Sequence, residues 1–377
     1  MSRKLKYLYL GGANVGGTYR VFLNLQRAVG QRGMDLQIET AADLVRAVSR
    51  REQIDAARAL VGRLKDTDGV IVNVFMAPAL MNVVRYLPPE FPRVMVVHTI
   101  THATYRAARA LRDHVHATIG VSFRIRDDLV RRFGFDASRT HAVFNAVDPD
   151  STADPNAPRP LNAVLSLGRL EDGSKGILQL PRIFDGEASR LGALSIAGDG
   201  PDRERLEEAY RRVGVAPNFL GLVQPSDVAS IYARHSIFLF PSRYEGMGLA
   251  LAEAMASGLV PIAARIRGVT DVIIEDGVSG YVFEQGDLKT AHARLLELLR
   301  DEARLTSMRV AAAERARALF SPERFAETYD AILRQVANAP FPVRSLPVER
   351  WSIPSGMQPG LRSVLPERLR AASAISC

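Results

Sequence analysis

Short apolar runs alternate with longer amphipathic stretches along most of this chain, and the alternation starts twice. The first series begins with KYLYL, a glycine loop and a helix expected from about Thr18 to Arg32. Further strands of this series are expected at DLQIET, GVIVNV, RVMVVH, ATIGVS and HAVFNAV. Short strands joined by helices are typical of a parallel sheet with helical crossovers.

A cluster of Asp, Pro and Ser residues at 148–160 separates the two series and predicts a domain boundary. Beyond it, strands are expected at AVLSLGRL, LSIAGDG, NFLGLV, IFLFPS, LVPIAA and GYVF. The length of 377 residues also exceeds that of a usual single domain. We therefore expect two doubly wound α/β domains.

The predicted boundaries follow from these breaks in the pattern. They are an N-terminal domain over 1–148, a linker over 149–160, a C-terminal domain over 161–320, a helix over 321–337 and a tail over 338–377. Ser321 and Pro322 open the helix as N-cap and first helical residue. The tail is rich in Pro, Ser and Arg, and is expected to be weakly ordered.

Composition narrows the partners and the compartment. The chain has 49 Lys and Arg against 41 Asp and Glu, an excess that favours anionic partners without choosing one. The single Cys, Cys377, excludes an intrachain disulfide and a thiolate metal site, and a cytoplasmic location is the simplest interpretation. The amino terminus has too short an apolar run for a signal peptide, and the apolar stretch 69–87 is interrupted by polar residues and Pro78.

The loop GGANVGGTYR lies between the first strand and the first helix, where glycines let a phosphate approach a helix amino terminus. Gly16 and Gly17 are the candidate contacts. A dinucleotide fingerprint would need glycine at position 13, which is Ala13, so a nicotinamide cofactor is a near miss. A tight turn without a ligand remains the alternative.

Two further motifs carry charge at expected strand ends. In GRLEDGSKG, the planar guanidinium of Arg169 and the flexible ammonium of Lys175 suit a diphosphate. Solvated surface charge is the alternative. In SRYEGMGLALAEAMASG, Glu245 and Glu253 flank a glycine loop that opens a helix. Carboxylates suit sugar hydroxyls, although a cap and an ordinary helix residue would explain them equally well.

Together these motifs resemble the family 4 retaining glycosyltransferases of the GT-B fold. The resemblance covers most of 160–330, through GRLEDGSKG, LSIAGDGPDRERLE, NFLGLV, the Glu245 to Glu253 segment and DGVSGYVF. The first domain resembles the family more loosely, through the glycine loop, GVSFRIRDDLV and FNAVD. This implies two Rossmann-like domains facing each other across a cleft, with an N-terminal acceptor side, a C-terminal nucleotide-sugar donor side and a helix at 321–337 packing back toward the N-terminal domain.

The resemblance also implies roles for individual residues. Arg169 and Lys175 would hold the donor diphosphate, Glu245 the transferred sugar and Glu253 the ribose. The remaining donor contacts would be Gly16, Gly17, Leu222, Val223, Gly246, Met247, Gly248 and Leu249, of which Leu222 and Val223 would lie near the nucleobase. His98, at the end of a first-domain strand, would contact the sugar, and His102 is a weaker candidate than His98.

The expected activity is a metal-independent, retaining transfer of a hexose-type sugar from a nucleoside-diphosphate sugar to an acceptor hydroxyl, without a cofactor. Envelope polysaccharide, glycolipid and natural-product glycoside all remain open as products. Arg106, Arg109 and Arg112 lie on one helical face and are candidates for an anionic lipid carrier or the inner face of a membrane, with a solvated face as the alternative. An NAD-dependent oxidoreductase and a non-catalytic sugar-nucleotide binder are the rival functions, and nucleic-acid binding has only the charge excess in its favour.

Overall fold

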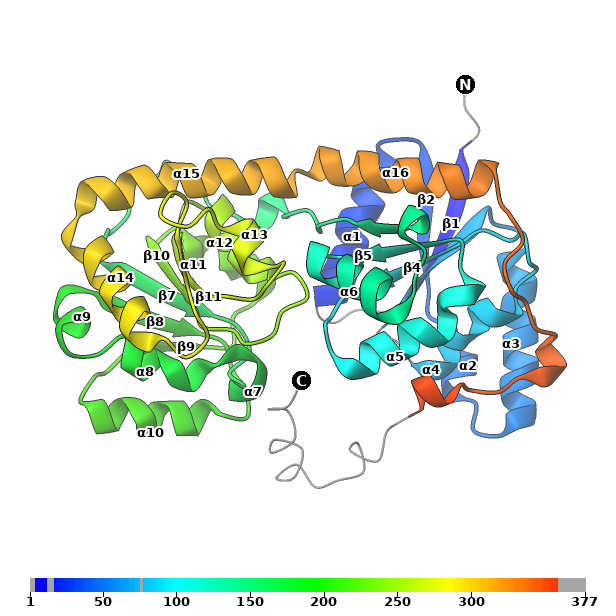
Figure 1. Cartoon of the computed structure of the whole chain (residues 1–377), viewed down its shortest axis with the longest axis horizontal. Helices are drawn as coiled ribbons and strands as arrows, with labels where there is room; N and C mark the ends of the chain where they lie inside the picture. The colour runs from blue at the N-terminus through cyan, green and yellow to red at the C-terminus, as the bar shows by residue number, and fades with distance from the viewer. Residues whose placement is uncertain (1–3, 12–16, 75–76, 359–377) are drawn as a thin grey trace. The chain divides into compact units, whose positions relative to one another are not determined.

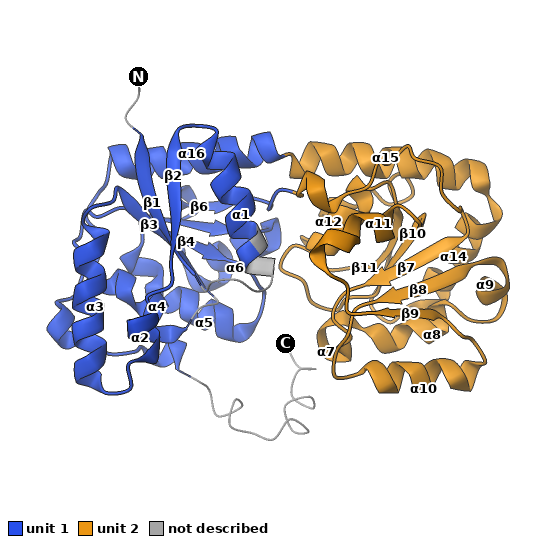
Figure 2. Ribbon diagram, turned by 180° about the vertical axis from the view of Figure 1, so that it is seen from behind, with its two compact units in different colours: residues 1–146, 322–377 blue, residues 147–321 orange. Residues whose placement is uncertain are grey.

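The computed structural model of the chain describes residues 4–11, 17–74 and 77–358 (Figure 1). The chain divides into two compact units, unit 1 with residues 1–146 and 322–377, and unit 2 with residues 147–321 (Figure 2). Each unit holds one parallel six-stranded sheet. The predicted pair of doubly wound α/β architectures is therefore confirmed, and the cleft between them stays a prediction.

The sheet of unit 1 has the strand order β2-β1-β3-β4-β5-β6. Its strands are β1 Leu5–Leu10, β2 Met34–Glu39, β3 Gly69–Asn73, β4 Arg93–Val97, β5 Ala117–Gly120 and β6 Thr140–Ala142. Its α-helices are α1 Gly17–Gly30, α2 Ala42–Arg46, α3 Arg50–Leu64, α4 Pro78–Asn82, α5 His102–Leu111, α6 Phe123–Phe133 and α16 Pro322–Asn338. Its 3-10 helices are η1 Val83–Tyr86, η2 Arg112–His114, η3 Ala137–Arg139, η7 Val348–Arg350 and η8 Ser355–Met357.

The sheet of unit 2 has the order β12-β11-β10-β7-β8-β9. Its strands are β7 Ala163–Leu167, β8 Ala193–Ala197, β9 Asn218–Gly221, β10 Ile237–Phe240, β11 Val260–Ala264 and β12 Tyr281–Phe283. Its α-helices are α7 Asp172–Lys175, α8 Leu180–Ile183, α9 Gly186–Leu191, α10 Arg203–Val213, α11 Val228–Tyr232, α12 Leu249–Ala256, α13 Thr270–Ile273, α14 Leu288–Arg300 and α15 Glu302–Phe320. Its 3-10 helices are η4 Pro149–Ser151, η5 Ile177–Gln179 and η6 Pro225–Asp227.

Continuous apolar runs form the central strands because helices cover both faces of a parallel sheet. Every residue of β3, β4, β10 and β11 is buried. In unit 2 the strand order reverses between β7 and β10, so the connections leaving these two strands run in opposite directions along the sheet. Such a switch point leaves a crevice outside the carboxyl ends of the strands, where ligands of doubly wound folds bind.

The segment 149–160, expected as a linker, lies within unit 2. The amide of Ala153 donates to Ser257 Oγ at 3.0 Å, and Arg159 donates to the Ser257 carbonyl at 2.8 Å. The cluster of turn-forming residues therefore packs against the end of α12. The expected helix at 321–337 is α16, which belongs to unit 1 and packs on α1, with Tyr7 Oη donating to the Leu333 carbonyl at 2.8 Å.

Residues 339–358, which we call the C-terminal strap, differ from the expected weakly ordered tail. The strap follows α16 and passes α3 before reaching α5 (Figure 1). Trp351 is buried in it, stacks on Tyr86 at 4.7 Å between ring centroids, and donates from Nε1 to Gln53 at 3.0 Å. One large aromatic side chain thus anchors a segment whose Pro and Ser content suggested little order. The rest of the predicted tail, residues 359–377, lies outside the described residues.

We predict that Trp351→Ala destabilises unit 1 by about 3 to 5 kcal/mol, because it empties a packed aromatic site. Denaturant unfolding followed by circular dichroism would measure the change. Val310→Ala, which truncates a half-exposed side chain on α15, is the control and should change stability little. A Trp351 variant as stable as the wild type would show that the strap is dispensable for the fold.

Candidate active site

Two loops meet at the switch point of unit 2. One leaves the carboxyl end of β7 and carries Gly168, Arg169 and the single helical turn α7, which ends at Lys175. The other leaves the carboxyl end of β10 and runs through residues 241–248 into α12. Strands β7 and β10 are hydrogen-bonded neighbours, so the sheet itself sets the two loops side by side.

Lys175 and Glu245 form an ion pair between these loops. Lys175 Nζ lies 2.6 Å from Glu245 Oε1, and the side chains are 31% and 11% exposed. A cation and a carboxylate held this close and partly shielded from water can act on a ligand that is anionic at one end and rich in hydroxyls at the other. Of the predicted site residues, these two are in direct contact.

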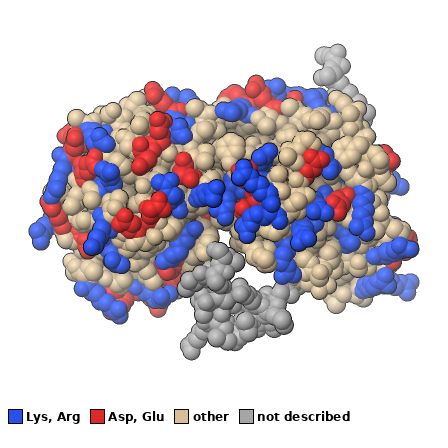
Figure 3. Space-filling view, in the orientation of Figure 1, with Lys and Arg blue, Asp and Glu red and all other residues tan. Residues whose placement is uncertain are grey.

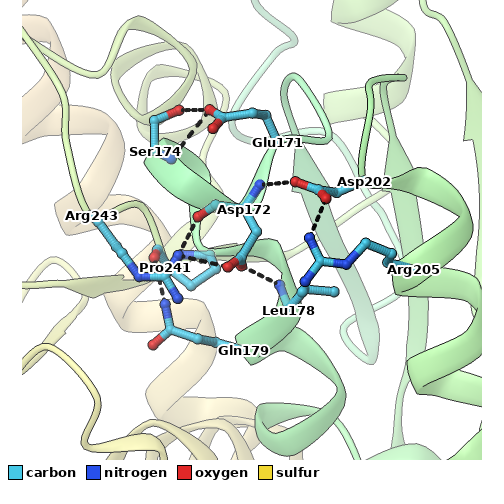
Figure 4. A network of polar contacts seen from close by, with 9 residues as sticks. All are labelled: Glu171, Asp172, Ser174, Leu178, Gln179, Asp202, Arg205, Pro241 and Arg243. Atoms are coloured by element: carbon cyan, nitrogen blue, oxygen red, sulfur yellow. Dashed lines mark hydrogen bonds and ion pairs between the residues drawn. The ribbon is translucent and has the colours of Figure 1, made fainter. Parts of the chain in front are cut away.

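A network of polar contacts fixes the turn that carries Lys175 (Figure 4). Asp172 lies at its centre, because its carboxylate accepts from the amide of Leu178 at 2.9 Å and pairs with Arg243 at 3.1 Å. The Asp172 amide in turn donates to Asp202 Oδ2 at 2.8 Å. This bond and the Arg205 guanidinium outweigh burial and lower the pKa of Asp202.

Main-chain contacts join the same turn to the second loop. The amides of Arg243 and Tyr244 donate to the Ser174 carbonyl at 2.8 and 3.2 Å. Gly176 ends the turn at φ +61°, and a Cβ there would lie 2.3 Å from the Pro241 carbonyl oxygen. Glycine is therefore required at position 176 both for its backbone conformation and for the close approach of the two loops.

Helix α12 opens the way the sequence predicted. Gly248 is its N-cap at φ +83°, so the segment Gly246, Met247, Gly248 and Leu249 leads the chain into the helix. Unpaired amides at a helix amino terminus attract anions. Glu253, one turn inside α12, is only 4% exposed, and its Oε2 accepts from Tyr232 Oη at 3.3 Å.

The other predicted donor residues of unit 2 are more exposed. Arg169 is exposed, and its guanidinium has no hydrogen bond or ion pair with any residue that the structure describes. Leu222 is 74% exposed and, with Val223, lines a hollow of about 390 Å³ beside β9 and α11. Asn218 and His235 also line this hollow, so it extends back along the edge strand, and Lys175 and Glu245 are not among its walls.

In unit 1, His98 directly follows β4 and is held by Asn73 at the end of β3. Asn73 Nδ2 donates to the Leu10 carbonyl at 3.0 Å, so its Oδ1 accepts from His98 Nε2 at 2.8 Å. Burial lowers the pKa of His98 to about 4, which keeps the ring neutral. With the proton on Nε2, the free Nδ1 is an acceptor suited to a hydroxyl.

The remaining first-domain candidates take no part in the contact between His98 and Asn73. Gly17 begins α1, and Gly16 lies outside the described residues. His102 is exposed at the start of α5, whereas His114 and His116 are buried structural histidines. Of the three arginines expected on one face, Arg106 donates to the Ser355 carbonyl at 2.8 Å and Arg112 pairs with Asp113 at 2.8 Å.

Within the described ranges, no group of three or more His, Cys, Asp or Glu side chains is arranged to hold a metal ion. Over the same ranges, no helix combines the length and apolarity needed to cross a membrane. Metal independence and the absence of a cofactor stay predictions.

The two parallel six-stranded sheets place this chain in a class of two-unit doubly wound α/β proteins. Solved structures with this fold include a glycosyltransferase from Rickettsia africae ESF-5 (TM-score 0.71, 16% identity, covering 88% of this chain and 98% of that one). Anabaena Alr3699/HepE in complex with UDP and glucose is another (TM-score 0.69, 15% identity, covering 88% and 100%). The unit architectures are thus those of GT-B glycosyltransferases.

The model of the family "Glycosyl transferases group 1" matches residues 149–318, which make up most of unit 2. Sulfoquinovosyl transferase SQD2 of Arabidopsis thaliana is 28% identical over 241 residues, which cover 61% of this chain and 47% of the relative. N-acetyl-alpha-D-glucosaminyl L-malate synthase of Bacillus anthracis is 31% identical over 143 residues, covering 38% and 37%. The matched regions thus span less than half of these two relatives.

Sequence reasoning missed the residues that hold the site together. Asp172, Asp202 and Arg243 stand in no pattern that spacing alone identifies, because their partners lie 30 and 71 residues away. One local signal was available, since Glu171 stands three residues before Ser174, a spacing that suits a cap. The Glu171 carboxylate does cap α7, accepting from the Ser174 amide at 3.2 Å.

We predict that Arg243→Ala weakens binding of nucleoside diphosphates by roughly tenfold, because the turn carrying Lys175 loses its main lateral support. Calorimetric titration would measure the change, and Arg243→Lys should restore part of it. Arg212→Ala on α10, which breaks an exposed pair with Glu208, is the matched control. Equal affinities for wild type and Arg243→Ala would remove the positioning role from Arg243.

Proposed function

We propose that this protein is a retaining glycosyltransferase of the hexosyltransferase type. It would transfer a sugar from a nucleoside-diphosphate sugar to an acceptor hydroxyl, without a metal. The observation that carries this proposal is the Lys175–Glu245 pair at the switch point of unit 2, most of which matches the glycosyl transferases group 1 model. One member of the pair suits the diphosphate and the other suits the sugar.

Cleaving the bond between the sugar and the phosphate adds negative charge to the departing diphosphate. Lys175, Arg169 and the amino terminus of α12 are positive groups of unit 2 that would stabilise this charge. Glu245 would orient the sugar through its hydroxyls, and Glu253 would accept from the ribose. A neutral His98 would accept a hydrogen bond from a sugar hydroxyl through Nδ1.

Retention follows in this proposal from attack on the same face of the sugar that the diphosphate leaves. The acceptor hydroxyl would pass its proton to the departing phosphate oxygen, and proximity would supply much of the acceleration. One relative is named as a sulfoquinovosyl transferase and the other as an N-acetyl-alpha-D-glucosaminyl L-malate synthase, so the proposal names no particular donor or acceptor. Polysaccharide, glycolipid and small-molecule acceptors are all compatible with the proposal.

We predict that the wild type binds one of UDP, GDP or ADP selectively, without added metal, and does not bind NAD. Lys175→Ala should remove sugar transfer and weaken binding by roughly a hundredfold, because the diphosphate loses a direct cationic contact. Glu253→Ala should weaken nucleotide binding while the fold persists. Calorimetry and circular dichroism would provide these measurements.

Three outcomes would contradict this assignment in different ways. Selective binding of NAD would favour the oxidoreductase. Nucleotide-sugar binding without transfer to any acceptor would favour the non-catalytic binder. Full activity in the Lys175 variant would remove the diphosphate role from that residue.

We also propose that unit 1 makes a peripheral contact with an anionic membrane, on the cytoplasmic side. Unit 1 contains 29 Lys and Arg against 17 Asp and Glu, whereas unit 2 contains 20 against 24. The positive excess of the chain therefore lies in unit 1, and Figure 3 shows Lys and Arg side chains gathered over α6. Arg131 and Arg132 are exposed there, near the end of the helix.

We predict that the wild type cosediments with vesicles containing an anionic phospholipid and less with neutral vesicles, an effect weakened by salt. Replacing Arg131 and Arg132 together by Glu should reduce the bound fraction severalfold. The same replacement of Arg211 and Arg212, an exposed adjacent pair at the end of α10 in unit 2, is the matched control. Equal loss in both variants would indicate a general charge effect rather than a surface on α6.

A further inference from the structure

The ion pair of unit 2 has a property that a simple phosphate site does not need. Lys175 Nζ, the cation that would meet the diphosphate, is in contact with the Glu245 carboxylate at 2.6 Å. Glu245 is only 11% exposed, so water screens its charge weakly. An anion that reaches Lys175 must therefore come close to a second anion.

The loop that carries Glu245 is also held in place by main-chain hydrogen bonds. The adjacent amides of Arg243 and Tyr244 are bound to the Ser174 carbonyl, and Lys175 is the next residue after Ser174. Asp172, on the same turn as Lys175, pairs with the Arg243 side chain. The backbone segments that carry the carboxylate and the ammonium are thus held together, so a ligand that engages Lys175 comes close to Glu245.

The sugar nucleotide and the free nucleoside diphosphate differ in charge at the terminal phosphate, next to Glu245. In a sugar nucleotide, the terminal phosphate is esterified and its next neighbour is a ring that bears hydroxyls, which can donate to a carboxylate. In the free nucleoside diphosphate, that ester is replaced by an ionised oxygen, because the second pKa of a phosphate monoester lies near 6. The product therefore carries an additional negative charge close to the Glu245 carboxylate and offers this carboxylate no hydrogen-bond donor.

We propose that Glu245 discriminates between donor and product: its carboxylate favours the sugar nucleotide through hydroxyl hydrogen bonds and repels the free nucleoside diphosphate. This inference rests on the proposed function and adds to it a way of releasing the product. Before the donor binds, Glu245 neutralises Lys175. After transfer, the ammonium and the carboxylate re-form their pair as the diphosphate leaves.

The experiment is a calorimetric titration of the full chain with three matched pairs, UDP with UDP-glucose, GDP with GDP-mannose and ADP with ADP-glucose. Glu245→Gln keeps the shape of the side chain and removes its charge. We expect it to bind the nucleoside diphosphate roughly tenfold more tightly than the wild type, because a close like charge is gone. It should bind the sugar nucleotide no more tightly, since it loses the strong hydroxyl acceptor.

Two further variants separate discrimination from a general effect of charge or fold. Glu245→Asp keeps the charge and should keep the preference for the sugar nucleotide. Glu187→Gln removes the same charge from an exposed pair with Arg300, on α9 at the opposite ends of the strands, and should leave both affinities unchanged. Structural damage would weaken binding, so tighter binding of the diphosphate is a sign that damage cannot produce.

The outcomes separate this inference from the proposed function. If the wild type binds neither member of any of the three pairs, the proposed function is overturned and the inference with it. If the wild type binds a pair but Glu245→Gln binds the diphosphate no more tightly, the glycosyltransferase proposal stands and the discrimination by Glu245 is overturned. A tighter complex with the diphosphate, unchanged in the Glu187 variant, supports the inference.

Discussion

One carboxylate, that of Asp172, determines where the lysine of the site can be. Helix α7 has four residues, too few for a helix to be stable by its own hydrogen bonds. Its position depends on contacts made by Asp172 with Leu178, Asp202 and Arg243. Because Arg243 precedes Glu245 by two residues, the same contacts that hold the turn also set the partner of Lys175.

The strands could be predicted from the sequence more completely than the site could. Runs such as GVIV and VPIAA are apolar because parallel strands are buried on both faces, and each expected run became a strand. Lys175 and Glu245 could be identified as candidates from motifs, but not as a contact. Their pairing depends on strand order, since β7 and β10 become neighbours only through a crossover. Trp351 was missed because one buried anchor outweighs the composition of the segment around it.

The two units carry opposite net charge, but the candidate diphosphate site lies in the unit with the acidic excess. The acidic excess of the unit does not exclude a diphosphate site, because charges more than about 10 Å apart are largely screened at physiological salt. In the proposed site, Lys175, Arg169 and the α12 amino terminus would act on a ligand at contact distance, whereas distant surface carboxylates would be screened. The net charge of a unit therefore bears on its encounter with large partners, and the local geometry bears on its ligand.

A carboxylate beside an anion-binding lysine lowers the affinity for any phosphate, which at first argues against a phosphate site. The objection applies only to a protein that must bind its ligand as tightly as possible. An enzyme that bound donor and product equally would remain occupied by product, and product release limits many turnover rates. Glu245 is almost buried and paired with Lys175, so it would reduce the affinity for the ligand that has lost its hydroxyl-bearing group. The pair is therefore better suited to transfer than to storage of a nucleotide.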